Sequence, residues 1–253
     1  PFENMCLKRP SQNRAQAIYQ AKDGYIYVGS QGGLDRFDGY NFKYFSHNPI
    51  DSTSVPNGWV SAINEDSNGN LWIGTTQKTM GYLNANGKWT RIKLKGMENW
   101  DRDGRSWWWG FISDIKPFKD QVVVSSNGNG LFILNSGKEK HFTSSYKEEN
   151  VISEIKVVNN RIFMATRGGM LELDTTNGKF KKTAISSPVY GFSKVVDLNK
   201  FYVSGDKKIY LYNFENNSLS KVNIDTNKKN RSYKRIALHN NKLWILNESY
   251  GIT

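Results

Sequence analysis

The side chains best suited to hold a ligand are concentrated between Lys95 and Phe111. Indole rings stack on the flat faces of sugar rings or aromatic ligands, and a guanidinium group can hold a carboxylate through two parallel hydrogen bonds. An insertion in a repeat protein also commonly lies on the binding face. We therefore predict a ligand-binding site formed by Trp100, Arg102, Arg105, Trp107 and Trp108, with Trp59 and Arg167 contributing from other loop ends.

A second interpretation of the same stretch stays open. Residues 107–112 can form a strand in which alternate indoles are buried, because side chains alternate between the two faces of a strand. In that case Trp107 and Trp108 take part in packing, and the tryptophans of this stretch make no contact with a ligand.

Catalytic and metal chemistry have little support in the sequence. His47, His141 and His239 lie far apart, and none has a neighbour at the spacing of a metal site. Cys6 is the single cysteine, which excludes an intramolecular disulfide and argues strongly against a cysteine-based metal site. The motifs of serine hydrolases, phosphate-binding loops and zinc proteases are absent from the sequence. We therefore expect no catalysis, no metal and no cofactor in this region.

The chain carries a formal net charge of +12, from 35 basic and 23 acidic residues. Such a charge can indicate nucleic-acid binding, but no recognition helix, zinc spacing or RNA-binding motif accompanies it. We expect instead a solvated basic surface whose long-range field attracts an anionic ligand such as an acidic oligosaccharide. No apolar stretch reaches the roughly 18 residues that a membrane helix requires.

The elements that position these groups are repeated along the chain. Residues 18–30 (IYQAKDGYIYVGS) match residues 63–75 (INEDSNGNLWIGT) position by position, and weaker copies follow. The central apolar residues of the copies are separated by 45, 51, 40, 39 and 42 residues. A period of about 40–45 residues, with four short strands in each unit, is typical of β-propeller blades. The central residues are Tyr27, Trp72, Val123, Phe163, Tyr202 and Trp244.

The spacing predicts an all-β propeller of four-stranded antiparallel blades that forms one domain over residues 1–253. A single sheet of this kind cannot bury both faces, so neighbouring blades must stack against one another. Trp72 and Trp244 are accordingly expected to be packing residues. About six units are present, and Thr253 lies within the sixth. We expect seven units in the intact ring, and the chain to be a fragment of a longer protein.

Two stretches resemble the repeat of the two-component regulator propellers. They are residues 66–75 (DSNGNLWIGT) and residues 33–42 (GLDRFDGYNF), and the specific part of the resemblance covers about residues 11–90. The later units are supported mainly by their spacing. The resemblance implies a propeller that forms the periplasmic sensor region of a membrane-bound bacterial signalling protein.

In that family, the propellers are followed by an immunoglobulin-like domain, a membrane helix and a cytoplasmic output. The output is often a hybrid histidine kinase, and in other members a diguanylate cyclase. Many hybrid members respond to breakdown products of polysaccharides. The resemblance thus implies a periplasmic ligand-sensing domain without catalysis, in a full-length protein that is a homodimer and binds no nucleic acid through this domain. A propeller that acts as a protein-interaction or dimerisation scaffold is the alternative, and a propeller glycosidase comes third.

Overall fold

The computed structural model describes residues 10–12, 14–76, 79–97, 110–135, 137–206, 208–223, 233–247 and 251–252. Regular structure in these ranges is β-strand, apart from short 3-10 helical turns such as Lys147–Asn150. The chain divides into two compact units, Pro1–His141 (unit 1) and Phe142–Thr253 (unit 2), and each is described by itself. The expectation of one domain over the whole chain stays a prediction.

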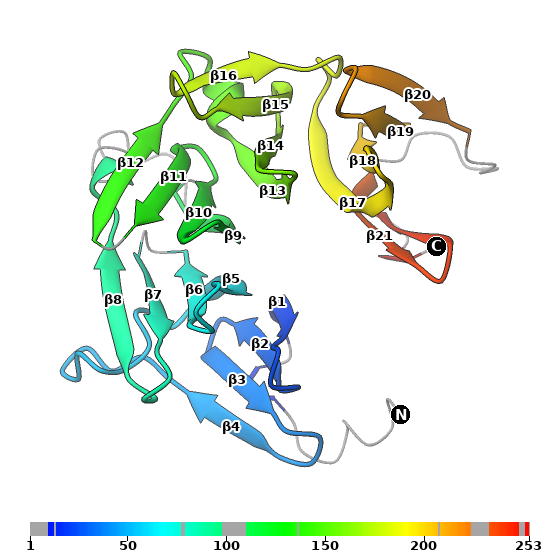
Figure 1. Cartoon of the computed structure of the whole chain (residues 1–253). Helices are drawn as coiled ribbons and strands as arrows, with labels where there is room; N and C mark the ends of the chain where they lie inside the picture. Colours follow the sequence, from blue (N-terminus) through cyan, green and yellow to red (C-terminus); the bar gives the residue numbers. More distant parts are fainter. Residues whose placement is uncertain are drawn as a thin grey trace. The chain divides into compact units, whose positions relative to one another are not determined.

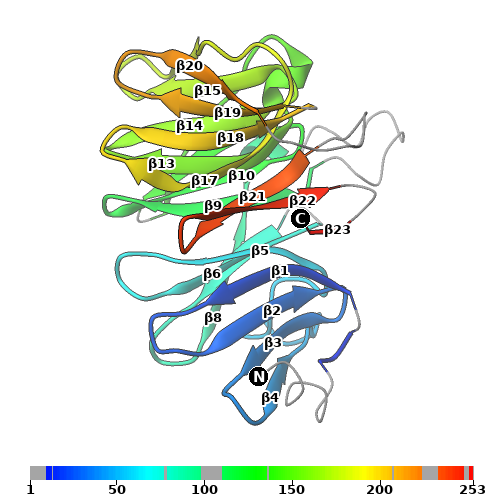
Figure 2. The same ribbon diagram turned by 90° about the vertical axis from the view of Figure 1, so that its right-hand side faces the viewer.

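Unit 1 contains three antiparallel sheets, each built from four strands that follow one another in the sequence (Figure 1). Figure 2 shows the four strands of sheet 1 side by side. Sheet 1 contains β1 (Ala15–Gln20), β2 (Ile26–Ser30), β3 (Gly33–Phe37) and β4 (Phe42–Phe45). Sheet 2 contains β5 (Val60–Glu65), β6 (Leu71–Thr75), β7 (Thr79–Leu83) and β8 (Trp89–Lys93). Sheet 3 contains β9 (Ile112–Phe118), β10 (Gln121–Ser126), β11 (Gly130–Asn135) and β12 (Lys138–Phe142).

Unit 2 repeats this arrangement in two four-stranded sheets and one sheet with three described strands. Sheet 4 contains β13 (Ile152–Val158), β14 (Arg161–Thr166), β15 (Gly169–Asp174) and β16 (Lys179–Lys182). Sheet 5 contains β17 (Val189–Asp197), β18 (Lys200–Gly205), β19 (Lys208–Asn213) and β20 (Ser218–Val222). Sheet 6 contains β21 (Tyr233–His239), β22 (Lys242–Asn247) and β23 (Gly251–Ile252).

Turn residues determine where the first two strands of each sheet fold back. The hairpin predicted at Asp23-Gly24 joins β1 to β2, and Gly24 has a φ of +91°. In unit 2, Asn159-Asn160 and Asn240-Asn241 each have two successive positive φ values, between +47° and +58°. Two positive φ values in succession suit the right-handed twist of a two-residue hairpin, and asparagine tolerates this conformation better than most residues.

The six central residues occupy equivalent positions, so the predicted repeat is confirmed. Ser30 pairs with Gly33 and Thr166 pairs with Gly169, where β3 and β15 begin. Tyr27 and Phe163 each lie three places before that last paired residue of the second strand. The other four central residues lie at the same distance from the ends of β6, β10, β18 and β22.

The central position packs against the sheet that follows, and this explains one wrong prediction. Tyr27 lies in a cluster with residues of sheet 2, Trp72 with residues of sheet 3, and Phe163 with residues of sheet 5. Trp72 is only 8% exposed, as predicted for a packing residue. Trp244 is 48% exposed, so the prediction that it is a packing residue is wrong. In the described part of the chain, no sheet follows sheet 6 to cover this indole.

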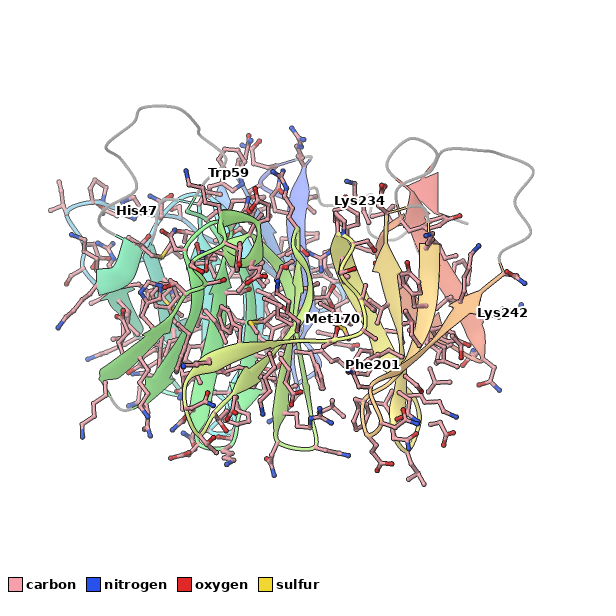
Figure 3. All side chains as sticks on the ribbon, turned by 90° about the horizontal axis from the view of Figure 1, so that it is seen from above. His47, Trp59, Met170, Phe201, Lys234 and Lys242 are labelled. Carbon is pink, nitrogen blue, oxygen red and sulfur yellow. The ribbon has the colours of Figure 1, made fainter. Side chains whose placement is uncertain are left out.

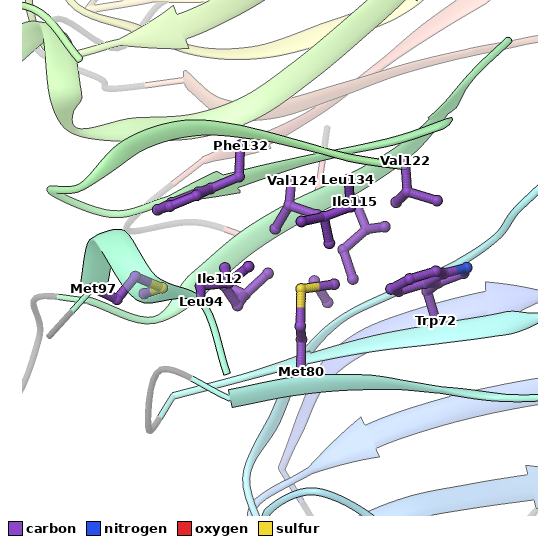
Figure 4. Close-up of a cluster of buried hydrophobic side chains, with 11 residues drawn as sticks. Trp72, Met80, Leu94, Met97, Ile112, Ile115, Val122, Val124, Phe132 and Leu134 are labelled. Atoms are coloured by element: carbon purple, nitrogen blue, oxygen red, sulfur yellow. The ribbon is translucent and has the colours of Figure 1, made fainter. Parts of the chain in front are cut away.

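Trp72 is held by Asp66, which directly follows β5 and begins the turn to β6. The carboxylate Oδ2 accepts a hydrogen bond from Trp72 Nε1 (2.8 Å), and Oδ1 accepts from the backbone N–H groups of Asn68 and Asn70 (2.9 Å each). Burial raises the pKa of the Asp66 carboxyl, but the hydrogen bonds outweigh burial and hold its pKa below the usual value. Trp72 then packs among the buried residues of sheets 2 and 3, including Met80 and Ile115 (Figure 4).

Sheets approach closely at the position two places after the central residue. A Cβ atom on Gly74 would lie 2.2 Å from Cγ2 of Ile112 in sheet 3, and one on Gly29 would lie 2.8 Å from Cγ1 of Val60 in sheet 2. Only small residues fit at such a contact. The equivalent residues are Ser125, Ala165 and Ser204 in the next three sheets, and Leu246, which is 40% exposed, in sheet 6.

Candidate functional site on the loop face

One end of sheets 2 to 5 combines two loops, and we call the described residues there the loop face. The first is the connection from the fourth strand of the preceding sheet, and the second is the turn between the second and third strands. Backbone hydrogen bonds join them: Thr76 donates to the carbonyl of Trp59 (3.1 Å), and Arg167 donates to the carbonyl of Val151 (3.3 Å). Figure 3 shows His47 and Trp59 at the same edge of unit 1.

Only two of the seven predicted ligand-binding residues can be placed. Trp59 is half-buried directly before β5, and Arg167 is exposed in the turn between β14 and β15, so both lie on the loop face. They belong to different units, and each is described only within its own unit. The other five lie outside the described residues, so the predicted site stays a prediction: Trp100, Arg102, Arg105, Trp107 and Trp108.

Arg91 holds the connection between sheets 1 and 2. This residue lies on β8, and its Nη2 donates to the carbonyl oxygens of Asn48 (2.9 Å) and Asp51 (2.7 Å) and to Ser54 Oγ (2.7 Å). Nδ1 of His47 lies 2.8 Å from the carbonyl oxygen of Val55 and closes the other side of the loop. His47 therefore has a structural contact here.

Glu139 holds the connection that leaves sheet 2. Its carboxylate, on β12, accepts hydrogen bonds from the backbone N–H groups of Lys95 (3.2 Å) and Gly96 (3.4 Å). Gly96 lies against the ring of His141, since a Cβ atom at this position would be 2.3 Å from Nδ1. The other ring nitrogen of His141 donates to the carbonyl of Asn129 (2.6 Å), and the ring stacks on Phe132 with 4.2 Å between ring centres. These contacts fix the segment that leads into the predicted ligand-binding stretch.

A buried carboxylate organises the connection that enters sheet 4. Glu149 accepts a hydrogen bond from the hydroxyl of Ser144 and forms an ion pair with Lys182 on β16 (3.2 Å). The turn that contains Arg167 packs directly on it, because a Cβ atom on Gly168 would lie 2.7 Å from Cγ of Glu149. Lys182 also lies over the exposed ring of Tyr146, 4.8 Å from its centre.

The connection between sheets 4 and 5 is also held by a polar side chain beside a fourth strand, as the three connections above are held. Asn217, next to β20, accepts a hydrogen bond from the backbone N–H of Ala184 (3.0 Å). In all four connections, a polar side chain on or beside the fourth strand of a sheet holds the connection that enters that sheet. These anchors were not predicted from the sequence, because nothing local distinguishes them from the other polar residues of strands that look like solvated edges. The anchors are Arg91, Glu139, Lys182 and Asn217.

Hydroxyl, amide and amino groups on first strands bind the backbone of the next sheet. Ser61 Oγ donates to the carbonyl of Ile112 (2.7 Å), and Asn64 Nδ2 donates to the carbonyl of Ile115 (2.8 Å). In unit 2, Ser153 Oγ lies 3.1 Å from the carbonyl oxygen of Tyr190, and Lys156 Nζ donates to the carbonyl of Ser193 (2.6 Å). Equivalent positions on β5 and β13 therefore hold neighbouring sheets in a fixed register.

One ion pair in unit 2 joins sheets that are not consecutive. Arg235 on β21 contacts Glu154 on β13 at 3.2 Å, and β17 of sheet 5 lies between these two strands in sequence. A Cβ atom on Gly191 of β17 would lie 2.9 Å from the same carboxylate oxygen of Glu154. The missing side chain at Gly191 therefore leaves room for Glu154 to reach Arg235.

The described polar anchors of the loop face make their hydrogen bonds and ion pairs to the connections that they hold. Among the described residues, no three His, Cys, Asp or Glu side chains come together in a way that could hold a metal ion. The described part of the chain also contains no helix long and apolar enough to cross a membrane.

Comparison with known proteins identifies the family that this chain resembles. Residues 54–77, which include Trp59 and the Asp66–Trp72 contact, match the family model of the two-component regulator propeller. The resemblance to that family is confirmed. A curated relative, histidine kinase P4 from Formosa agariphila, is 47% identical over 45 residues, which are 18% of this chain and 3% of the kinase.

Solved structures show the fold over nearly the whole chain. The extracellular domain assigned to a hybrid two-component system of B. thetaiotaomicron matches with a TM-score of 0.76 and 20% identity, over 96% of this chain and 33% of the solved chain. A second extracellular domain from the same organism, assigned to a one-component system, matches with a TM-score of 0.71 and 19% identity, over 94% of this chain and 31% of the other. The prediction of an all-β propeller of four-stranded blades is confirmed. The chain spans about a third of the length of these solved chains.

Proposed function

We propose that this propeller is the extracytoplasmic ligand-sensing domain of a membrane-bound signalling protein of the hybrid two-component type, and that this region catalyses no reaction. Two comparisons support the proposal: residues 54–77 match the two-component regulator propeller, and the solved relatives are extracellular domains of signalling systems. The periplasm is the compartment that this assignment implies.

The observation that carries the proposal is the set of four anchored connections on the loop face. Loops that are already ordered lose less conformational entropy when they bind a ligand, so more of the contact energy appears as affinity. Binding residues are commonly placed on loops held by a rigid scaffold. Arg91, Glu139, Lys182 and Asn217 provide such a scaffold in both units.

For the ligand we propose an acidic oligosaccharide. The proposal rests on the residue types themselves: the indole of Trp59, the guanidinium of Arg167, and the aromatic and basic side chains of residues 100–108. Stacking area from indoles and bidentate binding of a carboxylate by arginine suit a sugar acid.

Calorimetric titration of uronic-acid oligosaccharides, with neutral oligosaccharides of equal length alongside, tests this proposal. The double variant Arg102→Ala/Arg105→Ala should lose about 10- to 1,000-fold in affinity for the acidic ligand, since each hydrogen bond between charged groups contributes about 1.5–3 kcal/mol and groups that share a ligand are not additive. The matched control is Lys22→Ala/Lys242→Ala, which removes the same charge from exposed sites at hairpin turns between first and second strands.

Each outcome has a distinct meaning. Equal affinity in the wild type and the arginine variant would remove residues 102 and 105 from the site. An equal loss in the variant and its control would show that net charge, and not a specific site, attracts the ligand. If no oligosaccharide of a broad panel binds, the result would favour the alternative of a protein-interaction scaffold. Cleavage of an oligosaccharide during the titration would contradict the proposal that this region catalyses no reaction.

A further inference from the structure

The positive charge of the chain is concentrated on one kind of strand. The fourth strands of sheets 1 to 5 contain nine lysine or arginine residues and one acidic residue, Glu139, which is a net +8 out of the +12 of the whole chain. Each of the five strands is net positive. The first strands of the six sheets sum to +1 and the third strands to −1. The charge therefore follows a structural position and not a region of the sequence.

The fourth strands are the edges of their sheets. Each is at the end of the strand order of its sheet and pairs there only with the third strand. An edge strand presents unpaired backbone N–H and C=O groups, which can pair with a strand of another molecule. The first strands are at the opposite ends, and those of sheets 2 and 4 are joined to the next sheet by the side-chain bonds of Ser61 and Ser153.

The lysines of these edges are turned to solvent. Lys181 forms an ion pair with Asp174 (2.9 Å), and Lys182 forms one with Glu149 (3.2 Å). A lysine in the middle of an edge strand would have to lose its hydration if another strand paired there, and this opposes edge-to-edge association. The exposed lysines are Lys43, Lys93, Lys138, Lys140, Lys179, Lys181, Lys182 and Lys221.

We propose that the lysines of the fourth strands protect the sheet edges against pairing with other copies of this chain or with other strands. The excess positive charge of the protein then arises from this protection, and it does not mark a surface for a polyanionic partner. This inference is independent of the sensing function, because it concerns the outer edges of the sheets and not the loop face.

Three variants of the full chain test the proposal. The edge variant carries Lys138→Thr, Lys140→Thr, Lys179→Thr and Lys221→Thr, which lowers the net charge from +12 to +8 and places a residue that favours strands at each site. The control variant carries Lys22→Thr, Lys147→Thr, Lys208→Thr and Lys242→Thr, which gives the same +8 at exposed sites outside the fourth strands. The reversal variant carries glutamate at the four edge sites and has a net charge of +4.

Sedimentation velocity over a range of concentrations gives the weight-average mass of each variant. The edge variant should associate as its concentration rises, while the control and reversal variants should remain at the mass of the wild type. The reversal variant separates edge protection from net charge. A charge of either sign at the edge should prevent association, whereas an effect of net charge alone would make this variant associate most, because its net charge of +4 is the lowest of the three. Circular dichroism melting ensures that the comparison is made between folded proteins.

Three results would overturn the proposal. Association of the edge and control variants to the same extent would show that solubility depends on net charge alone. An edge variant that stays at the wild-type mass up to its solubility limit would show that these lysines do not restrain pairing. A loss of binding to heparin beads in the edge variant but not in the control would instead identify the outer strands as a polyanion surface.

Discussion

The contact between Trp72 and Asp66 links a repeat motif to the core, and its loss should lower the free energy of unfolding by a measurable amount. We expect Trp72→Phe to destabilise unit 1 by about 1.5–3 kcal/mol, because phenylalanine keeps most of the buried ring but loses the hydrogen bond to a carboxylate. Trp72→Ala should cost about 3–5 kcal/mol, the range for deleting a large buried aromatic side chain. The indole is 8% exposed and its Nε1 lies 2.8 Å from Asp66 Oδ2.

A double-mutant cycle with Asp66→Asn isolates the hydrogen bond from the packing. The coupling free energy should be about 1–3 kcal/mol, since both groups belong to one buried network. Trp89→Phe is the matched control, because Trp89 is similarly buried at 7% and lies in the same sheet. We expect no coupling between Trp89→Phe and Asp66→Asn.

The acid dependence of unfolding adds a second readout. The folded pKa of Asp66 lies below its usual value, so its ionised form contributes stability above the unfolded pKa of about 3.9, and this contribution is lost as the pH falls through the folded pKa. The difference in unfolding free energy between the wild type and Trp72→Phe should therefore shrink below about pH 4. Urea titrations at pH 7 and at several acidic pH values measure both quantities. A coupling energy near zero, or a difference that stays constant with pH, would refute this account of Asp66.

Three further variants probe the sheets and the loop face. Gly74→Ala should destabilise by about 1–3 kcal/mol because its Cβ would overlap Ile112, whereas Gly58→Ala, whose Cβ would meet nothing closer than 3.7 Å, should change the urea midpoint little. Ser153→Ala should cost about 1 kcal/mol in the urea midpoint by removing the bond from β13 to sheet 5, and an unchanged midpoint would show that the hydroxyl is dispensable. Arg91→Gln should speed amide hydrogen exchange in residues 48–55 while leaving sheet 3 unchanged, and equal exchange would show that Arg91 does not hold this loop.

The sequence predicted the repeat well because the repeat follows from local chemistry. Turn residues such as Asp23-Gly24 and the alternation of apolar residues can be recognised in a stretch of about ten residues. These local signals determine the strands and hairpins. The central residue of each second strand could also be aligned, from Tyr27 to Trp244. Burial of that residue could not be predicted from the alignment alone, because it depends on whether another sheet covers it, as Trp244 shows.

The loop anchors could not be predicted for a similar reason. Arg91 and Glu139 appear in the sequence as ordinary charged residues of solvated edge strands. Their role depends on a connection 37 to 44 residues earlier in the chain, and a local sequence pattern cannot show a contact over that separation. The net charge sums over edge lysines that are spread across five sheets, so it does not by itself locate a ligand site.

The framework already uses several polar side chains on or beside the loop face, and this narrows the search for the residues that bind the ligand. Arg91, Glu139 and Lys182 hold connections, the first-strand serines join sheets, and the edge lysines are distributed by strand position. A side chain that recognises a ligand has to be one that this framework does not already use. Trp59 and Arg167 meet that condition on the loop face, because the hydrogen bonds that fix them run through their backbone and not through the indole or the guanidinium. Mutagenesis aimed at ligand recognition should therefore begin with these two side chains and with residues 100–108, and it should use the anchors as controls for loop order.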